Sequence, residues 1–262
     1  MLRRAISAFA MPKPRARWFM LLCIISCGGA GTEPSTASSS SGGSGSSSGS
    51  AGPPADLGAP KAGVATFYDA NGTGNCGFDA SPKDLMVVAL NKQRYWEGSA
   101  LCGACLNVAG PKGSVVVRVV DSCPVDTPEV DCGDSGADLD LSKEAFEKVG
   151  TPKNGRESVT FQVVPCQVAG NMEYRFKEGS SQYWTAIQLR NHRLPVSKLE
   201  YKKNGAWTDM PRVDYNYFID PKGVGVQPQG LSLRITSRDG KVLEDQVPAV
   251  LDGKSATGSK QF

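Results

Sequence analysis

The cysteines of this chain are confined to one half of it, and this limits the possible folds more than any other feature. The 262 residues contain eight cysteines, six of which lie between residues 76 and 166, and none follows. In an exported chain an even number of cysteines favours disulfides. The part after residue 167 must then be held together by an apolar core alone. We therefore predict two domains, residues 61–167 and 168–255, followed by a short tail at 256–262.

The chain begins like an exported protein. Five basic residues precede an apolar run at residues 18–25, which is too short to span a bilayer permanently. Residues 24–28 are similar to the lipobox of bacterial lipoproteins, in which Cys27 would be lipidated and become the mature N-terminus. We interpret residues 1–27 as a lipoprotein signal peptide, with a plain secretory signal as the alternative. The protein is then lipid-anchored to the bacterial outer membrane or cell surface, or it is secreted.

Residues 28–60 have the composition of a tether. They are rich in glycine and serine, contain almost no large apolar side chains, and end in a proline-containing stretch. Such a segment cannot bury a core and behaves as a flexible coil. About 30 residues of this kind have a root-mean-square reach of roughly 30 Å. We expect a disordered tether that lets the folded part explore the surroundings of its anchor.

Several classes of function are disfavoured by charge and composition. The net charge of +3 is too small and too dispersed for nucleic-acid binding. His192 is the single histidine, which weighs against Ser–His–Asp or Cys–His catalysis and against a histidine-rich metal centre. We interpret His192 as a structural or rim residue. Any chemistry must rest on carboxylates, and we expect a monomer that needs no cofactor and no metal.

The motif Cys102-Gly-Ala-Cys105 allows three interpretations. A redox motif would require a strand-to-helix context, whereas the residues that follow predict a strand and a turn. A zinc site would require a second cysteine pair at ligand spacing, and the sequence has no other CxxC. Disulfide bonding is the interpretation we favour.

The first domain is predicted to consist of short strands and one short helix. The expected strands are residues 63–69, 85–91, 105–109, 114–121 and 159–166. The valine-rich run at residues 115–120 is typical of a strand that is buried on both faces. A helix is expected at residues 142–149, with Ser142 as its N-cap and Gly150 at its end. A domain that consists mostly of short strands and contains one short helix favours a compact barrel.

The second domain is predicted to contain only strands. Asn204-Gly205 and Asp239-Gly240 each separate two strand-like segments and indicate type I′ hairpins. Leucine and isoleucine alternate with polar residues over 231–236, which indicates a strand with one buried and one solvent-exposed face. Strands at this spacing are typical of an antiparallel β-sandwich.

Trp184 stands at the parity opposite to that of the apolar core residues Ile187 and Leu189, and Tyr183 precedes it at the strand entry. Because side chains alternate between the two faces of a sheet, Trp184 is predicted on the solvent face, with Tyr183 beside it. The other residues predicted on that face are Ala186 and Gln188. Exposed aromatics on a rigid sheet are typical of a platform that stacks on sugar rings. The alternative is that a neighbouring domain covers Trp184.

Two aspartates of the first domain are candidates for chemistry. Asp121 ends the most buried strand, and Asp140 lies just before the predicted helix. Cys123 and Cys132 would staple the loop between them, and Thr66 could donate a hydrogen bond to one carboxylate. Strand ends and helix entries can hold a carboxylate rigidly. The alternative is that Asp121 forms a turn and Asp140 caps the helix.

Five blocks of the sequence closely resemble bacterial expansins. They are GVATFY (63–68), CGAC (102–105), GPKGSVVVRVVDSCP (110–124), ADLDLS (137–142) and EYRFKEGSSQYWTAIQLRNHRLPVSKLEY (173–201). The resemblance implies an all-β architecture, with a six-stranded double-psi β-barrel followed by an immunoglobulin-like β-sandwich that binds cellulose. It further implies that the protein loosens cellulose networks without hydrolysing them. Cellulose and related β-1,4-glucans are the expected partners, and xylan and peptidoglycan stay open.

The resemblance assigns individual positions. Residues Thr66, Asp121 and Asp140 match the polar groove of the barrel, and Tyr183, Trp184 and Tyr215 match three in-line aromatics, with Lys177 near them. Tyr215 is assigned on the resemblance alone. Where the simpler bacterial form has a groove tyrosine, this chain has Cys123. The resemblance to disulfide-bearing relatives implies the pairs Cys76–Cys102, Cys105–Cys166 and Cys123–Cys132.

The same barrel occurs in enzymes, so catalysis has to be considered. Family 45 glycoside hydrolases invert stereochemistry with a general acid, which Asp140 resembles, and a separate base. Asp69 stands where that base lies, although an aspartate close to a glycine is more often a turn former. Lytic transglycosylases with a similar barrel use one acid and act on peptidoglycan. A pure binding module is a third alternative.

Overall fold

The computed structural model describes residues 57–124, 132 and 136–262, all of which belong to one structural unit. The predicted signal peptide, the lipidation site Cys27 and the tether up to residue 56 lie outside the described residues. Within the described part of the chain, strands dominate and helices are short. No helix in that part is long and apolar enough to cross a bilayer.

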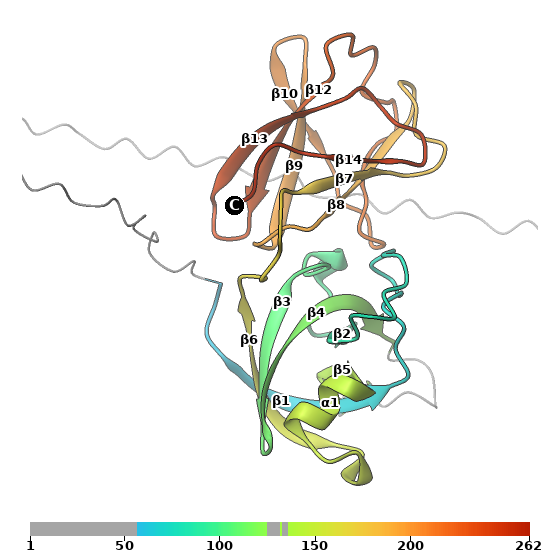
Figure 1. The fold of residues 1–262 in the computed structure, drawn as a ribbon. Helices are drawn as coiled ribbons and strands as arrows, with labels where there is room; N and C mark the ends of the chain where they lie inside the picture. Colours follow the sequence, from blue (N-terminus) through green and yellow to red (C-terminus); the bar gives the residue numbers. More distant parts are fainter. Residues whose placement is uncertain (1–56, 125–131, 133–135) are drawn as a thin grey trace, which may run out of the picture. The chain divides into compact units, whose positions relative to one another are not determined.

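Six strands of the first domain form a closed barrel in the order β1-β5-β2-β4-β3-β6 (Figure 1). The strands are β1 (Lys61–Tyr68), β2 (Val87–Asn91), β3 (Cys105–Gly110), β4 (Gly113–Cys123), β5 (Leu139–Ser142) and β6 (Glu157–Val164). The pairs β1–β5 and β2–β4 are parallel, and the other four are antiparallel. The predicted six-stranded barrel is thereby confirmed. Strand β5 has only four residues and was expected as part of the helix entry.

The helix α1 (Lys143–Val149) begins and ends where the sequence predicts. Ser142 is its N-cap, and its Oγ accepts a hydrogen bond from the backbone N–H of Ala145 at 3.1 Å. The chain leaves the helix at Gly150. The apolar face of the helix buries Phe146 and Val149 against the barrel. Two short 3₁₀ helices, η1 (Glu97–Ser99) and η2 (Pro152–Asn154), complete the domain.

The valine-rich strand β4 is buried for only part of its length. Val119 and Val120 are fully buried, but Val116 is 44% exposed. The change in burial coincides with a change of partner, because β4 pairs with β3 over Gly113–Arg118 and with β2 only from Arg118 onward. Before that residue it forms a hairpin arm with β3 alone. The prediction that the whole run is buried on both faces is therefore wrong for its first part.

Three disulfides join the six barrel cysteines in the pairs that the resemblance implied: Cys76–Cys102, Cys105–Cys166 and Cys123–Cys132. The two cysteines of the Cys-Gly-Ala-Cys motif thus bond to different partners. The loops that the disulfides close span 26, 61 and 9 residues. Closures of this kind contribute about 2–4 kcal/mol each to stability.

The second domain is a sandwich of two antiparallel sheets, as predicted (Figure 1). One sheet has the order β10-β9-β12-β13 and the other β11-β8-β7-β14. The strands are β7 (Glu173–Phe176), β8 (Thr185–Arg190), β9 (Val196–Lys203), β10 (Ala206–Met210), β11 (Phe218–Asp220), β12 (Leu231–Ser237), β13 (Val242–Val247) and β14 (Ser255–Thr257). Every second residue of β12 is buried, which fills the space between the sheets with apolar side chains.

Only one of the two predicted type I′ hairpins has that geometry. Asn204 and Gly205 both have positive φ (51° and 84°), as a type I′ turn requires. At the second site Gly240 has positive φ (84°) but Asp239 does not. The Ser237 N–H instead donates to the Lys241 carbonyl at 2.9 Å, which closes a longer loop. Asp239-Gly240 therefore marks a hairpin of a different turn type.

Residues at both ends of the described part of the chain pack against the folded domains. The expected tail at 256–262 is wrong, because β14 pairs with the edge strand β7 at Ala256 and Phe262 packs against the sandwich core. An edge strand left unpaired would expose its backbone hydrogen-bonding groups. The last residues of the expected tether also lie against the barrel. Leu57 is buried, and the Gly58 carbonyl accepts a hydrogen bond from Gln162 at 2.7 Å.

Candidate functional site

Four neighbouring barrel strands place Thr66, Asp140, Ala89 and Asp121 in one row. Thr66 of β1 pairs with Asp140 of β5, which pairs with Ala89 of β2, which pairs with Asp121 of β4. Directly opposed residues share a face of the sheet, so all four side chains point the same way. The two aspartates are two strand spacings apart, roughly 10 Å between Cα atoms. The small side chain of Ala89 separates the two carboxylates, and we call this row of side chains the barrel groove, after the region that it matches in the family resemblance.

Asp140 is held by Thr66 in a half-buried position. Thr66 Oγ1 donates a hydrogen bond of 2.8 Å to Asp140 Oδ1. Burial raises the pKa of the Asp140 carboxyl, the Thr66 hydrogen bond partly offsets this, and the charge of Asp121 raises the pKa further. The structure therefore brings together the three groove residues that the sequence singled out. A carboxyl with a raised pKa holds its proton to a higher pH than an exposed aspartate does.

Asp121 is fixed by the backbone rather than by side chains. Its Oδ1 accepts hydrogen bonds from the N–H groups of Asn75 (2.7 Å) and Ser122 (2.8 Å). Burial raises the pKa of Asp121, and these two hydrogen bonds oppose that shift. A Cβ on Gly74 would lie 2.3 Å from the Asp121 carboxyl carbon. Glycine at residue 74 is thus required for the loop to approach the carboxylate.

Tyr68 is a groove residue that the sequence reasoning missed. It follows Thr66 by two residues in β1, so its ring lies on the same face, and it packs against the cluster of Ala89, Cys123, Cys132 and Ala137. Its hydroxyl oxygen is buried and has no hydrogen-bond partner among the described residues. Burial first, and then the charges of Asp121 and Asp140, raise its pKa. The same parity argument that was applied to Trp184 could have identified Tyr68.

Tyr68 changes the interpretation of Cys123. The resemblance suggested that an aromatic side chain is missing from the groove, because a cysteine stands at residue 123. The structure puts Cys123 Sγ in a disulfide, 4.0 Å from Asp140 Oδ2, with the Tyr68 ring packed against it. An aromatic ring is therefore present at the groove, but it comes from β1.

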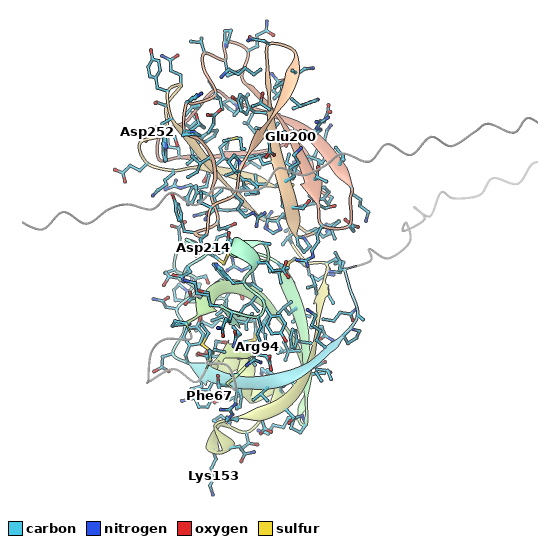
Figure 2. All side chains as sticks on the ribbon, turned by 180° about the vertical axis from the view of Figure 1, so that it is seen from behind. Phe67, Arg94, Lys153, Glu200, Asp214 and Asp252 are labelled. Carbon is cyan, nitrogen blue, oxygen red and sulfur yellow. A yellow bond between two sulfur atoms is a disulfide. The ribbon has the colours of Figure 1, made fainter. Side chains whose placement is uncertain are left out.

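Asp138 is a structural carboxylate close in sequence to Asp140. It is buried, accepts hydrogen bonds from the Val64 N–H (2.8 Å) and the Tyr95 hydroxyl (3.2 Å), and forms an ion pair with Arg94. Arg94 is labelled in the barrel in Figure 2. These bonds fix the entry of β5 next to β1 and so set the position of Asp140.

Asp69, the candidate general base, lies one residue beyond β1 and is exposed. Its side chain has no hydrogen-bond or ion-pair partner among the described residues. In the part of the chain that the structure describes, no group of three or more histidine, cysteine, aspartate or glutamate residues could hold a metal ion. The carboxylates with organised surroundings in the groove are Asp121 and Asp140.

The predicted aromatic face lies at the start of β8 and beside it. Tyr183 is 75% exposed and Trp184 is half-buried, and both precede the first residue of β8. Tyr215 is 45% exposed and lies in the loop that leads into β11. Because β11 runs antiparallel to β8, Tyr215 lies toward the Gln188 end of β8, roughly 13 Å along the strand from Trp184. These three aromatics are called the aromatic face below.

Lys177 reaches the aromatic face through a neighbouring ring. Its Nζ lies 5.5 Å from the ring centre of Tyr217, and that ring lies 5.9 Å from the ring of Tyr215. The turn that presents Tyr215 depends on Asn216, which has a positive φ of 62°. The Asn216 side chain donates to the Cys76 carbonyl at 3.2 Å.

The middle of the face predicted to be exposed is covered. Ala186 and Gln188 are fully buried, which contradicts the prediction for these two residues. Gln188 Nε2 donates to the Cys76 carbonyl of the barrel at 2.8 Å, so a barrel loop lies over this part of the sheet. The barrel thus covers Gln188, whereas Trp184, for which a covering domain was the alternative, is half-buried.

His192 is a structural residue at the same junction. It is buried, its Nδ1 lies 2.9 Å from the Leu194 carbonyl, and a Cβ on Gly103 would lie 2.6 Å from its Nε2. Burial, with a contribution from the charge of Arg212, lowers the pKa of His192 to about 4. A second junction contact is the 2.6 Å hydrogen bond from Trp96 Nε1 to Asp214, a residue labelled in Figure 2.

Comparisons with known proteins agree with this geometry. Residues 61–161 match a family model described as lytic transglycolase. Expansin-YoaJ of Bacillus subtilis is 40% identical over 191 residues, which cover 71% of this chain and 77% of that protein. Expansin-like protein 1 of Dictyostelium discoideum is 33% identical over 213 residues, 76% of this chain and 70% of the relative.

A solved structure shows the same architecture. The crystal structure of a point mutant of the Clavibacter michiganensis expansin in complex with cellohexaose superposes with a TM-score of 0.68 at 29% identity. The alignment covers 78% of this chain and 98% of that one. Barrel, sandwich and sequence similarity extend together over nearly the whole described part of the chain. The protein therefore belongs to the expansin family and is similar to its bacterial members.

Proposed function

We propose that this protein binds cellulose or a closely related β-1,4-glucan and loosens contacts between glucan chains without hydrolysing them. The exposure of Tyr183 and Tyr215, which lie in the segments that lead into β8 and β11, is the observation that carries the proposal. The cellohexaose complex of the Clavibacter expansin supports the choice of ligand. Aromatic stacking contributes on the order of 1 kcal/mol per ring beyond area burial. Three rings in a line give an affinity for an extended polymer that one ring alone does not.

The barrel groove acts on a glucan chain by competing for its hydrogen bonds. The Asp121 and Asp140 carboxylates accept hydrogen bonds from sugar hydroxyls, and the Thr66 and Tyr68 hydroxyls can donate or accept. Hydrogen bonds to an ionised carboxylate are stronger than those between neutral groups. A chain held in the groove therefore exchanges its bonds to neighbouring chains for bonds to the protein, and no covalent bond needs to break.

The proposal is tested by removing the aromatic face. The variant Tyr183→Ala/Trp184→Ala/Tyr215→Ala of the full-length protein should lose most of its binding to crystalline cellulose in a pull-down assay. Its thermal unfolding should stay close to that of the wild type, since two of the three side chains are exposed and one is half-buried. Val242→Ala, at another exposed position of the sandwich, is the matched control. Unchanged cellulose binding in the triple variant would contradict the proposal.

An enzymatic function is the second candidate, and two observations favour it. The family model that matches the barrel is described as lytic transglycolase, and burial raises the pKa of Asp140 as a general acid requires. Hydrolysis of a glucan would release reducing ends, and inversion would need Asp69 or Asp121 as base. Transglycosylation of peptidoglycan would release anhydro sugars. Product analysis with cellulose, xylan and peptidoglycan distinguishes these reactions, and loss of product in Asp69→Asn would identify the base.

We further propose that the protein is exported and acts as a lipid-anchored monomer. The three disulfides support an oxidising compartment. Mass spectrometry of the mature N-terminal peptide should show lipid on Cys27, and Cys27→Ser should release the protein from membranes. An unmodified N-terminus elsewhere in the segment would instead identify a plain secretory signal.

A further inference from the structure

A fourth aromatic side chain of the sandwich lies on the opposite sheet from the aromatic face. Trp207 belongs to β10 and is half-buried. Its sheet has the order β10-β9-β12-β13, whereas Tyr183 and Trp184 adjoin β8 of the other sheet. Large aromatic residues on the outer face of a sheet require an explanation, because tryptophan is mostly buried.

The register of this sheet aligns Trp207 with three polar side chains. Trp207 pairs with Lys202 of β9, and Ser232 of β12 pairs with Gln246 of β13. The pairing of β9 with β12, in which Tyr201 opposes Leu233, places Lys202 opposite Ser232. The four side chains therefore form one row across the outer face. With strands about 4.8 Å apart, the row is roughly 14 Å long.

A hollow of about 300 Å³ lies along this row. Its lining includes the four residues of the row together with Glu244 and Lys260. We call this hollow the Trp207 site. It is confined to the sandwich and shares no residue with the barrel groove or the aromatic face.

The indole ring in the Trp207 site is held in a fixed orientation. The Arg234 guanidinium lies 4.6 Å from the ring centre and is itself bound to Glu200 by two hydrogen bonds of 2.9 Å. Glu200 is labelled on this sheet in Figure 2. The ammonium of Lys202 lies 5.6 Å from the ring centre. A ring that is already immobilised loses little entropy when a ligand stacks on it.

The polar groups of the site are suited to a neutral, hydroxyl-rich ligand. Among the described residues, the side chains of Ser232 and Lys260 have no hydrogen-bond partner. Gln246 donates to the Gln229 carbonyl at 2.5 Å, which leaves its amide oxygen free to accept. Two lysines, Lys202 and Lys260, are balanced in the lining by Glu244 and Asp245. A charged polymer would meet repulsion from half of these groups, whereas sugar hydroxyls can use donors and acceptors alike.

We propose that the Trp207 site is a second saccharide-binding site, which takes a neutral glycan chain of the cellohexaose type. The ligand stacks on the indole and exchanges hydrogen bonds with Lys202, Ser232 and Gln246. The sandwich then binds two chains, one on each sheet. This inference goes beyond the proposed function, because it does not depend on the aromatic face or on loosening.

Calorimetric titration of the full-length protein with cellohexaose tests the site. The variant Tyr183→Ala/Trp184→Ala/Tyr215→Ala should retain a binding component that belongs to the Trp207 site, besides that of the barrel groove. Adding Trp207→Ala in that background should weaken the remaining binding by about fivefold or more, which corresponds to the loss of one stacked ring. Trp207→Phe should keep affinity within about twofold of the background, since a ring remains over Arg234.

The controls separate loss of the site from loss of the fold. Val242→Ala lies on the same outer face outside the hollow and should change nothing. Ser232→Gln fills the hollow, leaves the indole in place and should weaken binding as Trp207→Ala does. Three results would overturn the inference: no binding in the triple variant, binding unaffected by Trp207→Ala and Ser232→Gln, or tighter binding of a galacturonate oligomer. None of them depends on whether the aromatic face binds cellulose.

Discussion

Burial raises the pKa of Asp140 in the groove and lowers the pKa of His192 at the junction between the domains. For Asp140 it favours the protonated carboxyl, and the neighbouring Asp121 adds to the effect. For His192 it favours the neutral imidazole, whose surroundings provide backbone partners. In both cases folding disfavours the charged form. The two residues should therefore contribute opposite slopes to the dependence of stability on pH.

Asp140→Asn should make the protein more stable relative to the wild type as pH rises. A carboxyl whose pKa is raised on folding binds more protons in the native state, so the wild type loses stability as pH rises from the ordinary aspartate pKa through the raised one. The amide cannot ionise and can still accept the Thr66 hydrogen bond. Urea unfolding between pH 3.5 and 7 measures the difference. A stability difference that does not change with pH would contradict this account of Asp140.

Replacement of His192 by asparagine should reduce the loss of stability that the wild type shows as pH falls. With a pKa lowered from 6.5 to about 4, the histidine stabilises the fold fully above pH 6.5 and loses this contribution as pH falls toward 4. The shift corresponds to roughly 3 kcal/mol. Wild-type stability should fall more steeply than that of His192→Asn over this interval in urea unfolding. Parallel curves would show that His192 is not a buried neutral side chain.

At the scale of the elements, two of the three disulfides differ in role: Cys105–Cys166 supports the fold, and Cys123–Cys132 lies at the groove. Cys105–Cys166 closes 61 residues and ties β3 to the segment after β6. Cys123–Cys132 closes only 9 residues, but its sulfur lies beside Asp140 and Tyr68. The entropy of the unfolded chain is reduced more by a long loop than by a short one.

Removing these two disulfides should therefore have different consequences. Cys105→Ala/Cys166→Ala should cost about 4 kcal/mol of stability, and Cys123→Ala/Cys132→Ala about 2.5 kcal/mol, by loop length. The second variant, and not the first, should lose loosening activity at a temperature where both are folded. Thermal unfolding and extension of a cellulose network measure the two effects. Equal loss of loosening in both variants would show that the short disulfide has no special role at the groove.

The strand patterns predicted where most strands lie and which of their side chains are buried. They predicted little about which segments pack over which sheet. Parity correctly put residues 187 and 189 in the core. It was wrong for Gln188, because the loop that covers this residue comes from the barrel, about 110 positions earlier, and leaves no trace in the strand pattern. The row from Thr66 to Asp121 likewise depends on the order β1-β5-β2-β4, in which neighbours in space are not neighbours in sequence. Tyr68 could have been found by parity, whereas Tyr215 required the family resemblance.

At the scale of the whole molecule, the proposed function gives the aromatic face and the groove different roles. Stacking on exposed rings would hold the protein on a polymer surface, and the carboxylates and hydroxyls of the barrel would compete for the hydrogen bonds of a single chain. Direct hydrogen bonds join the two domains, from Gln188 to the Cys76 carbonyl and from Trp96 to Asp214. Binding and loosening should then be separable by mutation, because different residues provide them.

The most direct test is the extension of a cellulose network under constant load, with released sugars assayed in the same sample. We predict that the wild type extends the network without releasing reducing ends or anhydro sugars. The triple aromatic-face variant should neither bind nor extend it, and Asp140→Asn should bind but fail to extend it. Soluble sugars released in proportion to extension, and lost in Asp140→Asn, would contradict the account and establish an enzyme.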